Sequence, residues 1–141
     1  MANKYINLYM NNPTADNTDG TQVSTDDTET SPIAVTLDAS KNEVKYIKCA
    51  IRCNSGYKTS GNVTLSFVGN NKAKWALSDD SGYTNDNIAT KGTFSDTLTI
   101  TNEITDKNKI FWVKATSSSD EEPQNDKSTN IELKATIMAV E

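Results

Sequence analysis

Pairs of neighbouring acidic residues are the first candidates for chemistry in this sequence. General acid–base catalysis needs one carboxylic acid in a desolvated pocket, where its pKa rises toward the working pH. All three pairs fall in polar stretches, so we interpret them as solvated loop charges and predict that the protein is not an enzyme. The pairs are Asp26/Asp27, Asp79/Asp80 and Glu121/Glu122.

The two cysteines are the next candidates. Histidine is absent, which excludes Ser-His-Asp and Cys-His catalysts. A reactive thiol would then need a neighbouring cation to lower its pKa. Arg52 precedes Cys53, but on a strand it faces the opposite side of the sheet. Cys49 and Cys53 would share one face about 13 Å apart, too far for a disulfide bond. We therefore predict two buried apolar side chains and no metal site.

The sequence NTDG at residues 17–20 suggests calcium binding, because it is similar to the centre of an EF-hand loop. That loop requires an acidic first ligand, and the corresponding position holds Ala15. The EF-hand interpretation is therefore rejected, and we predict no cofactor. A loop calcium site in a β-sandwich stays open as an alternative. Its ligands would come from Asp16, Asp19, Asp26 or Asp120–Glu122.

Ligands of other classes find little support. Trp75 and Trp112 could line a sugar site, but both fall in strand patterns, so a core role is preferred. The chain has no phosphate-binding glycine loop and no aromatic platform in basic surroundings. Its net charge of -5 argues against nucleic acid or an anionic membrane as a partner.

Alternating apolar residues predict about seven strands between residues 32 and 141, with turn residues between them. A chain of 141 residues is the size of one domain, and no segment has a convincing helical period. This pattern is typical of an antiparallel sandwich, immunoglobulin-like or jelly-roll. The apolar rows include Ile33, Val35 and Leu37; Val63, Leu65 and Phe67; and Ile131, Leu133, Ala135 and Ile137.

Two strands carry more specific expectations. In Glu43–Cys53 the apolar parity changes near Tyr46 and Ile47, which predicts a β-bulge or a bend there. The segment Lys109–Ala115 is apolar on both faces, which predicts a central strand of a sheet. The polar stretch at residues 78–92 is expected to be a hairpin region.

The front of the chain supports two interpretations. The apolar stretch Tyr5–Met10 is too short for the apolar region of an export signal, and no run is long enough to span a bilayer. We therefore expect synthesis in a bacterial cytoplasm without a signal peptide. Tyr5–Met10 is either the first strand of the sandwich or an arm that adds to a neighbouring subunit. Residues 12–31 then form either a linker or a connection with a short strand at Thr21–Ser24. The expected division is 1–31, N-terminal strand and acidic connection, and 32–141, sandwich.

Three parts of the sequence together carry a family resemblance. They are INLYMNNPTADNTDGTQVSTD near the start, IKCAIRCNSGYKTSG in the middle and IFWVKATSSSDEEPQNDKSTNIELKATI near the end. The chain resembles small immunoglobulin-like virion proteins, head-decoration or tail-associated, of tailed phages and prophages of Gram-positive bacteria. The resemblance rests on overall texture and on the closing strand pattern rather than on a diagnostic motif.

The resemblance implies an all-β, antiparallel, immunoglobulin-like β-sandwich with an N-terminal strand or arm. It also implies a structural component of a phage particle, most often a capsid decoration protein, that contacts a major capsid or tail protein and forms a homo-oligomer or multi-copy array. A module for cell-surface carbohydrate is the alternative, with Tyr57 and Tyr83 as its aromatic candidates. The expected docking residues are Tyr5, Ile6, Leu8, Tyr9 and Met10. A covalent variant with a Lys–Asn isopeptide bond is also open.

Overall fold

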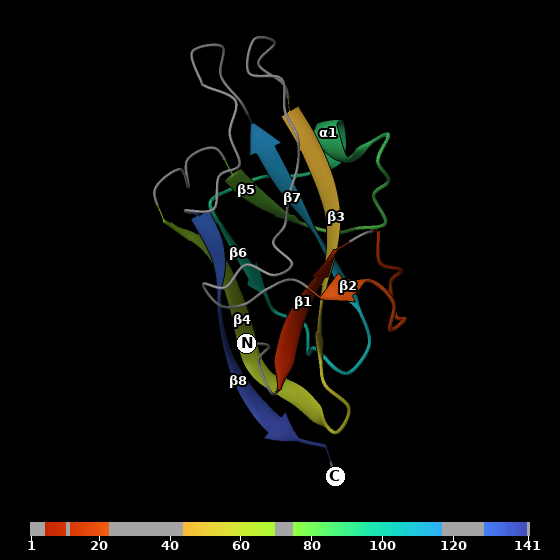
Figure 1. The fold of residues 1–141 in the computed structure, drawn as a ribbon, viewed down its shortest axis with the longest axis vertical. Coiled ribbons are helices and arrows are strands. Elements are labelled where there is room, and N and C mark those ends of the chain that lie inside the picture. Colours follow the sequence, from red (N-terminus) through yellow and green to blue (C-terminus); the bar gives the residue numbers. More distant parts are fainter. Residues whose placement is uncertain (1–4, 11, 23–43, 70–74, 117–128, 141) are drawn as a thin grey trace.

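The computed structural model describes residues 5–10, 12–22, 44–69, 75–116 and 129–140. These residues form two antiparallel sheets that pack face to face, which confirms the all-β prediction and is consistent with a β-sandwich (Figure 1). The elements are β1 (Ile6–Met10), β2 (Thr21–Gln22), β3 (Val44–Cys53), β4 (Tyr57–Gly69), β5 (Trp75–Asp79), α1 (Ile88–Lys91), β6 (Thr97–Ile100), β7 (Lys109–Thr116) and β8 (Thr129–Ala139).

The larger sheet has the strand order β2-β1-β3-β7-β5. Strand β7 therefore has a neighbour on both sides, as its apolar sequence predicted. Phe111 and Val113 face the smaller sheet, and Ile110 and Trp112 face outward, and all four are buried. A strand covered on both faces reads as a continuous apolar run, because neither face meets water.

The smaller sheet has the order β6-β4-β8. Its inward row on β4, Val63, Leu65 and Phe67, is buried as predicted. The register of β4 against β8 shifts between Ser60 and Thr64. Gly61 lies in that interval with φ +81°, a left-handed conformation that glycine adopts at low cost.

The main core lies between the two sheets. It joins Ile6 and Leu8 of β1, both cysteines of β3, the inward row of β4 and the inward side chains of β7. The inward residues of β8 pack against it from one flank and are only partly buried. These residues are Ile131, Leu133, Ala135 and Ile137.

A second apolar cluster covers the outer face of the larger sheet. Residues 80–96, with α1 at their centre, pack Ile88 onto Ala50, Ile110 and Trp112. The polar hairpin predicted at residues 78–92 is therefore wrong in part. This segment covers the sheet, and its helix is only four residues long, too short to give a helical period.

The bulge predicted near Tyr46 and Ile47 is also wrong. Strand β3 pairs with β7 without a register shift from Val44 opposite Thr116 to Ile51 opposite Lys109. The apolar parity changes because Tyr46 joins the outer cluster, whereas Ile47 packs on the main core. Both faces of this strand are apolar in that stretch, and its backbone is regular.

Several predictions lie outside the described residues. They include the strand Ile33–Leu37, the acidic pairs Asp26/Asp27 and Glu121/Glu122, and the boundary between residues 31 and 32. Strand β2, over Thr21–Gln22, agrees with the second of the two alternatives for residues 12–31, a connection that contains a short strand. Strands β1 and β2 belong to the larger sheet, so the first part of the chain shares its core with the rest.

Candidate functional site

The structure places the stretch Tyr5–Met10 in the protein's own larger sheet. Strand β1 pairs with β3, from Ile6 opposite Cys53 to Tyr9 opposite Ala50, and with β2 through Tyr9 and Met10. Ile6 and Leu8 are each 3% exposed and Tyr9 is 6% exposed. In this fold, the three side chains are covered by the chain itself.

Tyr5 and Met10 are the two expected docking residues that keep accessible surface. Tyr5 is 39% exposed and its ring meets the ring of Tyr57 edge-on, with centroids 4.9 Å apart. Met10 is partly buried against the main core. A docking role for the front of the chain therefore stays a prediction for these two side chains.

The strongest polar cluster in the described chain holds the segment that follows β1. Asp19 accepts hydrogen bonds on its carboxylate from the backbone N–H of Thr14, from the Thr14 hydroxyl and from Asn108 Nδ2, each at 2.8 Å. The hydrogen bonds from Thr14 are the largest cause of a lowered pKa of Asp19. This carboxylate, a candidate calcium ligand in the sequence, is engaged by donors of the protein.

Arg52 connects this cluster to strand β3. Its guanidinium donates to the Asp19 carbonyl and to Asn108 Oδ1, both at 2.8 Å. Its carbon Cζ lies 3.6 Å from the centre of the Tyr9 ring, a cation–π contact. The segment at residues 12–20 is thereby fixed on the outer face of the larger sheet, at the end that carries β1 and β2.

Asn108 is the residue of this cluster that the sequence reading missed. It is 3% exposed. Its backbone N–H donates to the Asn17 carbonyl, and its own carbonyl accepts from the Asp16 N–H. Its side chain also donates to the Thr14 carbonyl at 2.9 Å. Asn108 is one of sixteen asparagines, and no local pattern distinguishes it from the others.

The pair Asp79/Asp80 also has a structural use. Asp80 Oδ1 accepts hydrogen bonds from the Trp112 indole N–H and from the Tyr83 backbone N–H, both at 3.0 Å. Asp79 is exposed. Trp112 is fully buried, which confirms its core role, and Asp80 supplies the acceptor that a buried indole N–H requires. Trp75 is partly buried beside Phe67.

Cys49 and Cys53 are free and buried, as predicted. Desolvation raises the pKa of the Cys49 thiol far above its ordinary value. Desolvation, followed by the negative charge of Asp106, raises the pKa of Cys53 to about 11. Since the thiolate is the nucleophile, both environments oppose thiol chemistry at neutral pH.

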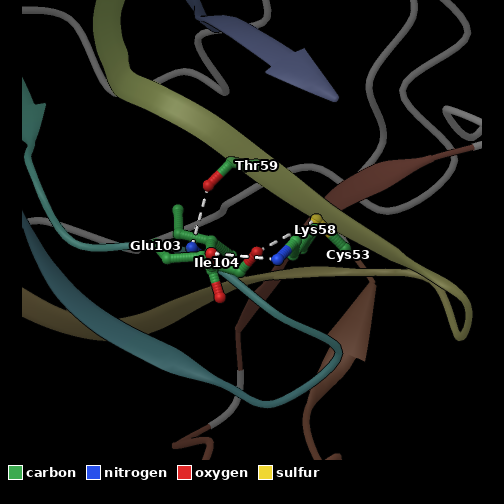
Figure 2. A network of polar contacts seen from close by, with 5 residues as sticks. All are labelled: Cys53, Lys58, Thr59, Glu103 and Ile104. Atoms are coloured by element: carbon green, nitrogen blue, oxygen red, sulfur yellow. Dashed lines mark hydrogen bonds and ion pairs between the residues drawn. The ribbon is translucent and has the colours of Figure 1, made fainter. Parts of the chain in front are cut away.

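A second polar network, drawn in Figure 2, joins the two sheets near Cys53. The backbone N–H of Ile104 donates to the Thr59 hydroxyl at 2.8 Å, and the Ile104 carbonyl accepts from the Thr59 N–H at 2.9 Å. The Cys53 thiol donates to the same carbonyl at 3.5 Å. Lys58 and Glu103 form a surface ion pair at 3.5 Å. Exposed ion pairs of this kind contribute little to the free energy of unfolding. This network fixes the connection between β6 and β7.

The described side chains contain no group of three His, Cys, Asp or Glu residues arranged to hold a metal ion. Of the candidate calcium ligands, Asp26 and residues 120–122 lie outside the part of the chain that the structure describes. Within that same part, no helix is long and apolar enough to cross a bilayer. Comparison with protein-family models, with curated proteins and with solved structures finds no match.

Proposed function

We propose that this chain is a non-enzymatic structural component of a bacteriophage particle, attached to the capsid as a decoration protein. The observation that carries the proposal is how the fold uses the side chains that could ligate a metal ion or catalyse a reaction. Asp19 and Asp80 accept hydrogen bonds from the chain itself, and the two thiols are buried in its core, so these four candidates for ligation or catalysis are used by the fold. The choice of a phage particle as the site of attachment rests on the resemblance to virion proteins of tailed phages.

The strand pairing supports the finer proposal of an immunoglobulin-like topology. If β1, β3, β7 and β5 correspond to strands A, B, E and D, the larger sheet has the A-B-E-D order of that fold. Strands β4 and β8 then correspond to the paired strands C and F. The position of strand G, beside F, has no counterpart among the described strands.

Virion association is tested in the host whose genome carries the gene. Particles released by that host would be purified on a density gradient and examined for the chain by mass spectrometry. Antibody-gold labelling of the same particles separates a head location from a tail location. A chain that is synthesised in the cells but absent from purified particles would overturn the proposal.

Attachment through the front of the chain is tested on its two accessible residues. Tyr5→Ala and Met10→Ala together should reduce cosedimentation of the purified chain with particles that lack it, and leave the far-ultraviolet circular dichroism spectrum unchanged. The matched control is Val44→Ala, because Val44 is 40% exposed and lies in a different strand. Equal binding by both variants would place the attachment surface elsewhere.

A second candidate is a module that binds surface carbohydrate. The observation that favours it is a group of partly buried aromatic side chains on the outer face of the larger sheet: Tyr46, Tyr83 and Phe94. Tyr46 and Phe94 have ring centroids 5.5 Å apart, and Lys114 lies 5.8 Å from the Phe94 ring centre. Glycan-array binding that Tyr83→Ala abolishes and Tyr57→Ala preserves would establish this site, and no glycan binding would remove it.

A further inference from the structure

Strand β8 is the longest edge strand of the described fold. It runs for 11 residues, from Thr129 to Ala139, and pairs with β4 along one side. No other described strand pairs with its far side (Figure 1). Alternate residues of an edge strand direct their backbone N–H and C=O groups away from the sheet, which makes the edge a template for a further strand.

The side chains of β8 are less covered than those of its neighbour. Leu65 of β4 lies directly opposite Leu133 of β8, and both face the core. Leu65 is fully buried, whereas Leu133 keeps part of its surface accessible. The same difference holds between Phe67 and the opposite Ile131. The core is therefore covered less completely at β8 than at β4.

The other described edge strands are shorter than β8. Strand β2 has two residues and β6 has four. The edge of β5 is covered by Ser95, which exchanges two backbone hydrogen bonds with Leu77. Strand β8 contains neither proline nor glycine. Short strands and prolines are two of the means by which proteins block strand addition, and β8 uses neither.

The charges of β8 identify the strand that fits this edge. We propose that the far side of β8 pairs with β8 of a second copy of this chain, antiparallel, about a two-fold axis at Leu133. In that register Glu132 of each copy faces Lys134 of the other, which gives two opposite-charge pairs on the solvent face. Ile131 then faces Ala135 on the core face, so apolar residues meet apolar residues.

Other registers are less favourable. A slip of one residue would put the apolar row of one copy opposite the polar row of the other. A shift of two residues places Glu132 opposite Glu132 or Lys134 opposite Lys134, and like charges directly opposite each other destabilise a sheet. Within one molecule, Lys134 and Glu132 already form an ion pair at 3.2 Å, so both side chains are positioned on the face that the pairing uses.

The pairing rests on the proposed function, to which it adds a second copy of the chain as a partner, and its failure can be distinguished from the failure of that function. Virion association is measured on particles, whereas the pairing is measured on the purified full chain. A chain that is found in particles and does not pair through β8 would retain the proposed function and lose only this interface.

The first experiment measures the mass of the purified chain by analytical ultracentrifugation over a wide range of concentration. The unmodified chain should form a dimer. Glu132→Lys should weaken the dimer about tenfold, because both cross-strand pairs become repulsive. Glu132→Lys combined with Lys134→Glu should restore it, because the charges are exchanged and again opposite. A chain that stays monomeric, or a dimer that Glu132→Lys leaves intact, overturns the proposal.

The second experiment locates the two-fold axis by cysteine cross-linking under a mild oxidant. Leu133→Cys should give a disulfide-linked dimer, because directly opposite residues of antiparallel strands have Cα atoms about 4.5–5.5 Å apart, within disulfide reach. Ala135→Cys is the matched control, since the two copies of residue 135 would be separated by about four residues, or roughly 13 Å. Equal cross-linking of the two variants, or none for Leu133→Cys, contradicts the register.

Hydrogen exchange separates the second copy from an occupant within the same chain. Amides on the far side of β8 should gain protection as the concentration rises. Protection that is already complete at high dilution would mean that another segment of the chain, such as the strand predicted at Ile33–Leu37, covers the edge, and this result overturns the proposal.

Discussion

Asn108 links three separate parts of the fold through one buried side chain. Its Nδ2 donates to Thr14 and Asp19, and its Oδ1 accepts from Arg52. Asn108→Ala should lower the free energy of unfolding by about 2–3 kcal/mol, because Asn108 is itself buried and its hydrogen bonds to the charged Asp19 and Arg52 are lost. Asn102→Ala, an exposed asparagine of the same connection, should change it by less than about 0.5 kcal/mol. Urea unfolding followed by tryptophan fluorescence measures both, and equal effects would contradict the role of Asn108.

Asp19 should make stability depend on pH in the acid range. Hydrogen bonds from Thr14 hold its folded-state pKa below the ordinary value of 3.8. A lowered folded pKa means that the ionised form stabilises the fold above pH 3.8, and that this contribution is lost as the pH falls through the folded pKa. The stability difference between the unmodified chain and Asp19→Asn should therefore shrink on acidification. Thr14→Val, which removes one donor, should reduce the pH dependence, and parallel curves would contradict the prediction.

Strand β1 is an integral part of the larger sheet, which changes the expectation for truncation. As a separate arm, residues 1–12 could be deleted without unfolding the rest. In the structure, Ile6 and Leu8 are core residues and β1 pairs with both β2 and β3. Deletion of residues 1–12 should therefore unfold the chain or reduce it to a loosely packed state. Loss of near-ultraviolet circular dichroism and of cooperative unfolding measures this.

A point substitution in β1 tests the same conclusion without removing backbone. Leu8→Ala should lower the free energy of unfolding by about 2–5 kcal/mol, because a buried leucine leaves a cavity. Tyr5→Ala is the matched control in the same segment, since Tyr5 is 39% exposed, and it should cost clearly less. A truncated chain that folds cooperatively, with Leu8→Ala near neutral, would restore the arm interpretation.

Asp80 is one of the points at which the segment at residues 80–96 is attached to the larger sheet. Asp80→Ala should destabilise the protein by about 1–3 kcal/mol, because it leaves the buried Trp112 indole N–H without a partner. Asp80→Asn keeps an oxygen at the same position and should cost less. Thermal unfolding followed by Trp fluorescence compares the two. If Asp80→Asn costs as much as Asp80→Ala, the acceptor oxygen is not what fixes this segment.

The sequence predicts a strand well when one of its faces is apolar and the other polar, or when both faces are apolar. The inward row of β4, the central position of β7 and the burial of both cysteines follow from such patterns. The regular backbone of β3 did not follow from its pattern. Its second apolar face is explained by residues 80–96, which cover it in the folded protein. A parity change can mark a second packing face as well as a bulge.

The polar clusters were not predictable for a different physical reason. The hydrogen bonds of Asn108 reach residues 94 and 89 positions away in the chain. Hydrogen-bond partners at that separation meet only after the sheets have formed, so no local spacing records them. The sequence placed Asp19 among several candidate calcium ligands without distinguishing it from the others. The hydrogen bonds that it accepts from Thr14 and Asn108 show its role in the fold.

The whole molecule can be tested through its two thiols, which lie between the sheets. Cys49 is 0% exposed and Cys53 is 1% exposed, and burial raises the pKa of both. Alkylation at neutral pH should therefore require the sheets to separate, and denaturant should accelerate the reaction of both thiols in parallel. Mass spectrometry of Cys49→Ala and Cys53→Ala, each of which keeps one thiol, measures the two rates. If Cys53 reacted much faster than Cys49 in the absence of denaturant, the connection that holds Ile104 against Thr59 would open on its own, and the sandwich would not unfold as one unit.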